Sequence, residues 1–245
     1  MAEGSKVISV ALDAGAPVEA LFYAPEAGGD DRAGAVIDQA VEAGVRVYPL
    51  APGVMERVAD TVTPQPLVAV VAFVDVGLDA LAEASLVVVC ADVRDPGNAG
   101  TVLRSAEAAG ADGVICCDGS VDVYNPKTVR ASAGALFHVP VVAGGDVAPV
   151  LERLGGWGMH RLAAAAHDGR DYTEADLTTA VALVLGNEAA GVPSGLERWI
   201  DEPVNIPMSG RADSLNVGMA AAVLCFEAAR QRRQRAQRGC GARRA

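Results

Sequence analysis

The feature that most constrains the fold is a series of short apolar runs without polar alternation, separated by helical segments. Runs such as Leu86–Ala91 and Val181–Leu185 consist of β-branched and other aliphatic residues. A strand that is apolar on both sides needs cover on both faces, which is typical of a parallel sheet between two helical layers. The expected strands are Leu86–Ala91, Gly113–Cys117, Val139–Val142, Arg161–Ala165, Val181–Leu185 and Glu202–Ile206. The expected helices are Asn98–Gly110, Pro126–Leu136, Val147–Leu154 and Ser214 to about Arg235. The sequence therefore predicts an α/β domain over residues 85–235.

A smaller α/β unit precedes this domain. Its expected helices are Ser5–Ala14, Asp31–Ala43 and a short one that begins at Pro52, and its expected strands are Glu19–Tyr23, Val45–Pro49 and Leu67–Val74. We expect a small domain at residues 1–75, a linker at 76–84 and a basic, disordered tail at 236–245. The first residues, Met1–Lys6, begin where a first strand has already ended, so the small sheet is expected to be trimmed at its start.

The charge of the 245-residue chain is strongly uneven. The net charge is −11, yet residues 230–245 contain seven arginines and no acid. An acidic protein that binds a polyanion must rely on local clusters of arginine rather than on net charge. The arginine-rich end is either such a cluster or a solvated, frayed helix end.

Several classes of protein are excluded by what the sequence lacks. No apolar run approaches the roughly 20 residues that span a bilayer, and no basic-then-apolar signal opens the chain. The five cysteines form no CxxC pair, and the three histidines have no metal or triad spacing. Neither a P-loop nor a G-x-G-x-x-G turn is present. We expect a cytoplasmic protein without a metal site.

Polar residues gather in a glycine-rich turn after the first strand of the large domain. Asp95-Pro-Gly-Asn-Ala-Gly-Thr-Val-Leu-Arg104 contains Asn98, a candidate helix N-cap, and Arg104 on the second helical turn. Arg104 is either an exposed residue paired with Glu107 or a cation that binds a phosphate or favours ionisation of a hydroxyl.

Two further turns follow the last two predicted strands. Gly186, in Leu185-Gly-Asn-Glu188, would let a ligand touch the backbone at the carboxyl edge of the sheet, where open α/β sheets bind ligands. In Ile206-Pro-Met-Ser-Gly-Arg-Ala-Asp-Ser-Leu-Asn216, we expect Ser214 to cap the last helix and Asn216 to take its second position. The polar start of this otherwise apolar helix is predicted to face a cleft.

A fourth polar cluster lies in Asn125-Pro126-Lys127 and Arg130. Asn125 is an expected cap, and Lys127 and Arg130 lie three residues apart on one helix face. The two cations are either a solvated helix face or phosphate contacts.

The three turns, in this order, closely resemble the motifs of SpoU/TrmH-type RNA ribose 2′-O-methyltransferases of the SPOUT superfamily. Tyr124-Asn-Pro-Lys-x-x-Arg-x-Ser-x-Gly-Ala135 is also similar to that family. The resemblance implies a homodimer, a trefoil knot in the large domain and a bound S-adenosylmethionine. The implied cofactor contacts are Leu185, Gly186, Ile206, Met208 and Leu215. The implied catalytic residues are Asn98, Arg104, Ser214 and Asn216, and the matching Glu188 has an open role.

The small domain resembles the ribosomal-protein-L30e-like domain that precedes the knot in this family. The resemblance implies methyl transfer to structured RNA, with large-subunit ribosomal RNA as the expected substrate. Three alternatives stay open: methylation of transfer RNA, methylation of a base, and an RNA-binding module without catalysis.

Overall fold

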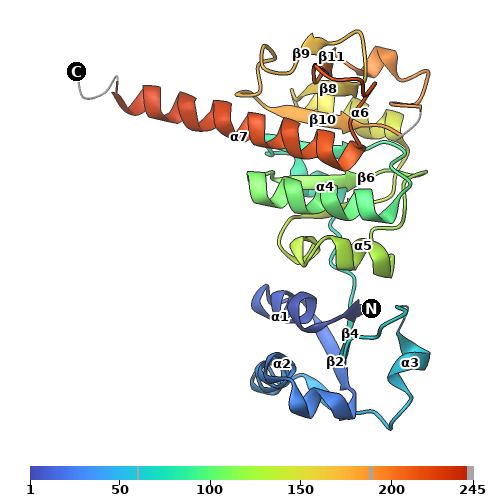
Figure 1. Cartoon of the computed structure of the whole chain (residues 1–245). Helices are drawn as coiled ribbons and strands as arrows, with labels where there is room; N and C mark the ends of the chain where they lie inside the picture. The colour runs from blue at the N-terminus through green and yellow to red at the C-terminus, as the bar shows by residue number, and fades with distance from the viewer. Residues whose placement is uncertain (60, 188–189, 242–245) are drawn as a thin grey trace.

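The chain folds around two sheets, a smaller one within residues 2–71 and a larger one within residues 86–205 (Figure 1). The computed structural model describes residues 1–59, 61–187 and 190–241. The smaller sheet contains β1–β4 and the larger one contains β5–β11. No helix of the described residues is long and apolar enough to cross a membrane.

The larger sheet has seven strands, and every neighbouring pair is parallel. The strands follow the order β7-β6-β5-β10-β8-β11-β9. Their bounds are β5 Leu86–Cys90, β6 Gly113–Cys116, β7 Val141–Ala143, β8 His160–Ala165, β9 Arg170–Asp171, β10 Val181–Leu185 and β11 Glu202–Asn205. This confirms the parallel sheet predicted from the unbroken apolar runs, with β9 as an addition.

Helices cover both faces of this sheet, as a doubly apolar strand requires. α4 (Pro96–Ala109) and α7 (Val217–Gly241) pack on one face, and α6 (Val147–Gly156) packs on the other. Successive side chains of β5 enter opposite cores: Val88 lies in the α4/α7 core, whereas Val87 and Val89 lie in the α6 core. α5 (Pro126–Ala131) and the 3-10 turn η3 (Ala135–Phe137) pack outside α4. The result is a three-layer α/β domain.

Four cysteines are buried as free thiols in this domain: Cys90, Cys116, Cys117 and Cys225. Burial raises the pKa of Cys117 and of Cys225 to about 12. The thiols of Cys117 and Cys225 are therefore protonated at neutral pH. All four buried cysteines pack as small apolar side chains.

The smaller sheet is mixed, with the order β1-β4-β2-β3. The bounds are β1 Ala2–Glu3, β2 Val18–Tyr23, β3 Arg46–Pro49 and β4 Leu67–Val71. α1 (Ser5–Asp13) and α2 (Asp31–Glu42) cover one face, and the short α3 (Met55–Val58) contributes Met55 to a separate small cluster with Val68. The first residues were predicted to follow a strand, but Ala2 and Glu3 themselves pair with β4.

The two domains are held together by packing and by the connecting segment. Val10 of α1 lies against Gly134, where a Cβ would collide with the valine side chain. In the connection, Tyr124 accepts a hydrogen bond from the Val74 amide at 2.9 Å and donates one to Asp75 at 2.7 Å. The predicted linker is therefore ordered, and its residues 78–81 form the 3-10 turn η2 (Leu78–Leu81).

The last helix differs from the sequence prediction at both ends. α7 begins at Val217 rather than at Ser214, and it continues to Gly241. Residues 236–241 are therefore helical where the composition predicted disorder. Figure 1 shows the second half of α7 extending away from the rest of the molecule.

Candidate active site

A cavity opens at the carboxyl ends of three neighbouring strands, β10, β8 and β11. Its volume is about 740 Å³ with its open mouth included. The lining residues are Ala164, Ala165, Ala166, Gly186, Asn187, Gly191, Val204, Ile206, Met208, Ser214, Leu215, Val217, Ala220 and Leu224. The carboxyl edge of a parallel sheet is where open α/β folds bind ligands, because the loops that leave the strands surround a crevice there.

The turn after β10 is closed by backbone hydrogen bonds. Asn187 N–H donates to the Gly191 carbonyl at 2.7 Å, and Gly191 N–H returns a bond to Asn187 at 2.9 Å. A Cβ at Gly186 would overlap the backbone of Gly191 and Val192. Glycine is thus required so that the loop can fold back, a reason that differs from the ligand contact inferred from the sequence.

The segment after β11 forms the other wall. Ile206, Met208, Ser214 and Leu215 from this segment line the cavity. Asn216 is the cap of α7, because its Oδ1 accepts hydrogen bonds from the amides of Gly218 at 2.9 Å and Met219 at 3.4 Å. The prediction that Ser214 caps the helix is wrong; Ser214 is exposed at the cavity instead.

The turn after β5 approaches both of these loops. Asp95, not Asn98, caps α4, since its carboxylate accepts from the Asn98 amide at 2.8 Å. Asn98 has another role: its Oδ1 accepts a hydrogen bond from Nδ2 of Asn216 at 2.8 Å. Nearby, Nδ2 of Asn187 donates to the Asp92 carbonyl at 3.3 Å. The three turns therefore meet at one place.

Arg104 lies on the exposed surface of α4, outside the cavity lining. Within the described parts of the chain its guanidinium makes no hydrogen bond or ion pair, so the pairing with Glu107 considered above is not formed. A cation that is left unpaired in an acidic protein is available to a ligand or to a second protein chain.

Four of the five expected cofactor residues line the cavity: Gly186, Ile206, Met208 and Leu215. Leu185 is fully buried in β10, where its side chain packs in the core. Glu188 lies outside the described residues.

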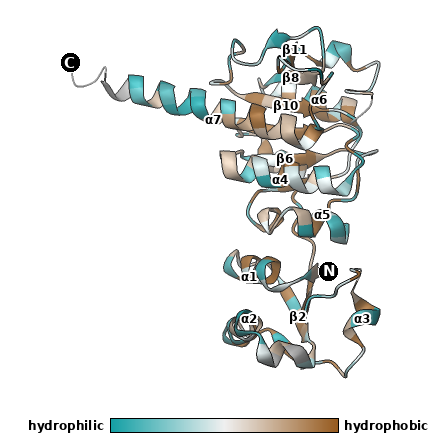
Figure 2. Ribbon diagram, viewed as in Figure 1, coloured by the Kyte–Doolittle hydropathy of each residue, from teal (hydrophilic) through white to brown (hydrophobic). Residues whose placement is uncertain are grey.

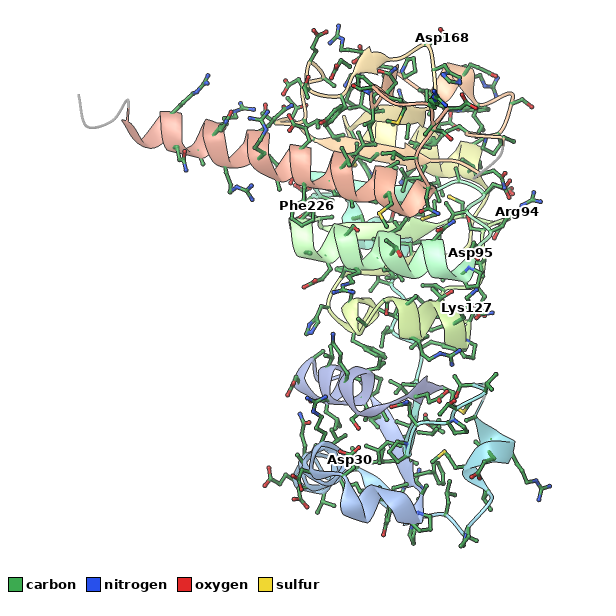
Figure 3. The ribbon with its side chains drawn as sticks, in the orientation of Figure 1. Asp30, Arg94, Asp95, Lys127, Asp168 and Phe226 are labelled. Carbon is green, nitrogen blue, oxygen red and sulfur yellow. The ribbon has the colours of Figure 1, made fainter. Side chains whose placement is uncertain are left out.

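The two cations of the fourth polar cluster, Lys127 and Arg130, lie in different environments. Lys127 is exposed, and its Nζ lies 3.7 Å from Asp95, on the side of the molecule that also carries Arg94 (Figure 3). Arg130 instead forms an ion pair at 3.2 Å with Glu3, a nearly buried residue of the small domain. The guanidinium of Arg130 is thus engaged between the domains, which argues against its predicted phosphate contact.

Sequence reasoning missed part of the cavity wall. Ala164, Ala165 and Ala166, at and just beyond the end of β8, and Gly191 all line the hollow. The available signal was positional, because β8 lies between β10 and β11 and its end must reach the same edge.

The cavity fits S-adenosylmethionine by the chemistry of its walls. Ile206, Met208, Leu215 and Leu224 offer an apolar surface to a flat ring. The Asn187 and Ser214 side chains and the strand-end backbone offer polar atoms beside it. Gly186, directly after β10, also lines the cavity. No cluster of three or more potential metal ligands exists among the residues whose positions are described.

The sequence matches the SpoU rRNA Methylase family over residues 85–226, more than half of the chain. The chain belongs to this family. Its first 69 residues match the MRM3-like substrate binding domain. The SpoU family match includes all three turns described above.

Similar proteins agree with this membership. A 23S rRNA (guanosine(2553)-2′-O)-methyltransferase of Bacillus subtilis is 37% identical over 186 residues, covering 76% of this chain and 73% of that protein. A 23S rRNA (uridine(2479)-2′-O)-methyltransferase of Streptomyces viridochromogenes is 40% identical over 142 residues, covering 56% of this chain and half of that protein.

Two solved structures resemble this SpoU chain over nearly its whole length. The AdoMet-bound rRNA methyltransferase from Sinorhizobium meliloti superposes with a TM-score of 0.79 at 32% identity, covering 93% of this chain and 85% of that one. AviRb from Streptomyces viridochromogenes, in complex with AdoMet, gives 0.81 at 31% identity, covering 95% and 90%.

Proposed function

We propose that this chain transfers the methyl group of S-adenosylmethionine to a ribose 2′-hydroxyl of large-subunit ribosomal RNA. The observation that carries the proposal is the bond between Asn98 and Asn216 beside a cavity at the sheet edge. The bond joins the turn after β5 to the segment after β11. The cavity beside it is lined by that segment and by the turn after β10. Membership of the SpoU family supports the reaction, and the relatives named for 23S rRNA support the substrate.

Some residues of the site would bind the cofactor, and others would position the ribose. S-adenosylmethionine supplies an electrophilic methyl group on a sulfonium. Gly186, Ile206, Met208 and Leu215 would hold it, with apolar contacts from the side chains and hydrogen bonds from the backbone. Ser214 and Asn216 would orient the ribose, since both place hydrogen-bonding groups at the start of α7. Placement of the reacting atoms in line accounts for much of the rate in such reactions.

Arg104 is the proposed catalytic cation. A ribose hydroxyl is a poor nucleophile until it loses proton density, and an unpaired guanidinium would stabilise the developing negative charge on oxygen. Because Arg104 is exposed and outside the cavity of its own chain, we propose that it acts at the cavity of a second copy.

A homodimer is supported by an apolar stripe on α7. Met219 is 56% exposed and Phe226 is 47% exposed, and the two lie two helical turns apart on one face. Leu215, just before the helix, is 38% exposed. Large apolar side chains in such a row favour contact with another protein surface. Family membership further supports a trefoil knot in the large domain and, for an RNA-modifying protein, a cytoplasmic location.

Two measurements test the proposal. Isothermal titration should show S-adenosylmethionine binding to the wild-type chain and, within a few-fold, to Arg104→Ala, while that variant loses methyl transfer. Normal turnover by Arg104→Ala would contradict the role of the guanidinium. An RNA-binding module without catalysis would show no cofactor binding and no transfer.

Mapping the product separates the remaining alternatives. Ribosomal RNA from cells with and without the gene should differ at one 2′-O-methylated nucleotide of the large-subunit RNA. A modified transfer RNA, or a methyl group on a base, would replace the present proposal with one of the alternatives raised by the sequence. Ribosomal RNA is favoured as the substrate because the match to the 23S rRNA enzyme of Bacillus subtilis spans 186 residues. This is more than the 142 residues of the methylase match, so the similarity extends beyond the methylase domain.

A further inference from the structure

The last helix consists of two parts with opposite character. Up to Ala229 it is part of the core, with Ala221, Leu224, Cys225 and Ala228 buried against the sheet and α4. From Arg230 to Arg238 no residue is buried. Figure 2 shows the change, with an apolar first half over the domain and a hydrophilic second half that projects from it. The second part therefore needs a reason other than packing.

This projecting part, which we name the arginine segment (residues 230–238), has the most basic surface of the chain. It contains five arginines and no acid, while the chain as a whole carries a net charge of −11. Cations near a helix C-terminus stabilise the helix dipole, but this effect is confined to the last turn. Arg230, Arg232, Arg233 and Arg235 lie further than one turn from Gly241. The dipole does not account for them.

Two of the five arginines, Arg232 and Arg235, hold the helix to the domain, whereas Arg230 pairs within the helix. Arg230 pairs with Glu227 at 2.6 Å. Arg232 donates to the carbonyls of Leu177, Ser85 and Thr179 at 2.7–2.9 Å, and Arg235 donates to Thr178. These bonds to the domain fix the direction in which the projecting part of α7 extends.

The other two arginines have no such role. Arg233 and Arg238 are exposed, and within the described ranges of the chain their guanidinium groups form no hydrogen bond or ion pair. A rigid helix thus holds two unpaired guanidinium groups in solvent, next to the anchoring arginines.

We propose that the arginine segment binds the phosphate backbone of the RNA substrate, independently of its sequence. The inference rests on the proposed function, which supplies RNA as the polyanion. A guanidinium presents a fork of donors that matches two phosphate oxygens. Phosphate contacts position a nucleic acid without reading its sequence. In an acidic protein, such a local basic surface is needed to hold the RNA near the cavity.

A lipid surface is the less suitable partner. A helix that lies in a membrane interface needs a large apolar face opposite its cations. The exposed residues of the arginine segment are arginine, glutamine and alanine, and none has a large apolar side chain. The segment therefore has charge for a polyanion without the apolar face that membrane insertion requires.

The test is the salt dependence of RNA binding by the full chain. Binding of a labelled poly(U) of about 30 nucleotides would be measured for the wild type and for Arg233→Gln/Arg238→Gln. The salt concentration would run from about 0.05 to about 0.3 M, where phosphate contacts dominate the affinity. Loss of two phosphate contacts on a single strand should reduce the slope of log K against log salt by roughly 1.4 and weaken binding about 25-fold at 0.1 M salt. Arg233→Lys/Arg238→Lys should retain most of the slope.

A matched control carries the same charge change on the other side of the large sheet. Arg153 of α6 and Arg198 of the 3-10 turn η4 (Glu197–Trp199) are exposed, and η4 packs against α6. Arg153→Gln/Arg198→Gln should leave the slope unchanged. An equal loss in this control would overturn the proposal, because net charge rather than the arginine segment would then govern binding.

Two further outcomes also overturn it. One is an unchanged slope and affinity in Arg233→Gln/Arg238→Gln. The other is retained poly(U) binding together with loss of binding to vesicles of phosphatidylserine and phosphatidylcholine, which would assign the segment to membranes. Failure of the proposed function has a different signature: the wild type would bind no S-adenosylmethionine and transfer no methyl group, whatever the salt slope.

Discussion

Asn98 and Asn216 are joined by one side-chain hydrogen bond of 2.8 Å, although 118 positions separate them in the chain. The bond runs from the amide nitrogen of Asn216 to the amide oxygen of Asn98. The amide oxygen of Asn216 is used at the same time to cap α7. One residue thus fixes both the start of the last helix and the distance between the first and third turns.

Substitution of Asn216 should separate these two roles. Asn216→Asp keeps the oxygen acceptors that cap α7 but loses the donor to Asn98, so its stability should stay near that of the wild type while methyl transfer falls. Asn216→Ala loses both and should lower the free energy of unfolding by about 1 kcal/mol. Urea unfolding and methyl-transfer assays measure the two effects. Equal activity in Asn216→Asp and the wild type would show that the bond has no part in the site.

Gly186→Ala should abolish cofactor binding. The added methyl group would overlap the backbone of Gly191 and Val192, so the turn after β10 would have to move away from the cavity. Overpacking of this kind costs about 1–3 kcal/mol of stability. The matched control is Gly34→Ala in α2, where nothing lies within 4 Å of the added carbon. Calorimetric titration with S-adenosylmethionine should give normal binding for Gly34→Ala and none for Gly186→Ala.

Arg130→Gln should loosen the small domain. Glu3 is nearly buried, and besides the guanidinium it accepts bonds from Thr61 at 2.6 Å and from the Gln65 amide at 3.1 Å. Loss of the cation leaves a buried carboxylate without its charged partner, at a cost of about 2 kcal/mol. Faster proteolytic cleavage within residues 72–77 and a lower urea midpoint are the expected readouts.

The control for this change is Arg32→Gln. Arg32 and Arg130 line one cavity, whose other lining residues all belong to the small domain, and the side chain of Arg32 forms no ion pair with any residue placed by the structure. If both variants were cleaved at the wild-type rate, the pair between Glu3 and Arg130 would not be what holds the domains together.

Acid should weaken the contact between β8 and β11 through Asp201. Hydrogen bonds from Arg161, at 2.7 and 2.8 Å, hold the pKa of Asp201 below its ordinary value, although burial opposes this. A carboxyl whose pKa is lowered by folding stabilises the fold above its unfolded pKa, and this contribution is lost as pH falls through the folded value.

Asp201→Asn should therefore be less stable than the wild type at pH 7 to 8, by about 0.5–1 kcal/mol, because solvent screens this partly exposed ion pair. The difference should begin to shrink below the unfolded pKa of roughly 4, and it should be lost as the pH falls through the lower pKa of the folded carboxyl. Urea unfolding at a series of pH values measures it. A difference that stays constant down to pH 2 would show that the carboxylate charge does not stabilise the fold.

Phe226→Asp should give a monomer without activity. The substitution places a charge in the exposed apolar stripe of α7 (Figure 3 shows Phe226), and a desolvated charge at an interface is costly. Binding of S-adenosylmethionine should weaken only if the second chain contributes residues to the cavity. Sedimentation velocity reports the mass, with Phe73→Asp, an exposed phenylalanine of the connecting segment, as the control. A wild-type monomer would contradict the proposed sharing of Arg104.

Much of the fold could be predicted because the strands are marked locally. Leu86–Cys90 and Val181–Leu185 are apolar on both sides, so their burial between two layers is visible in the sequence. β9 has only two residues and is formed by pairing with Val204 and Asn205, which leaves no local pattern. The order of the strands likewise depends on distant partners.

The caps of the helices show where local reasoning fails. Before α4, both Asp95 and Asn98 are suitable caps, and before α7 both Ser214 and Asn216 are suitable. The path by which the chain enters each helix selects between them, and that path is set by packing on the sheet. The side chain that does not cap the helix takes a different partner, as Asn98 does with Asn216.

By itself the sequence determined the repeated alternation of buried strands and helices, the three glycine turns and the arginine-rich end, since each depends on residues that are neighbours in the chain. Tertiary structure alone decided that the three turns meet, that Arg130 is paired with Glu3 while Arg104 stays exposed, and that the basic end projects as a helix. The physical reason is that a contact between residues a hundred positions apart depends on the order of the strands in the sheet. That order cannot be predicted from the residues adjacent in the sequence.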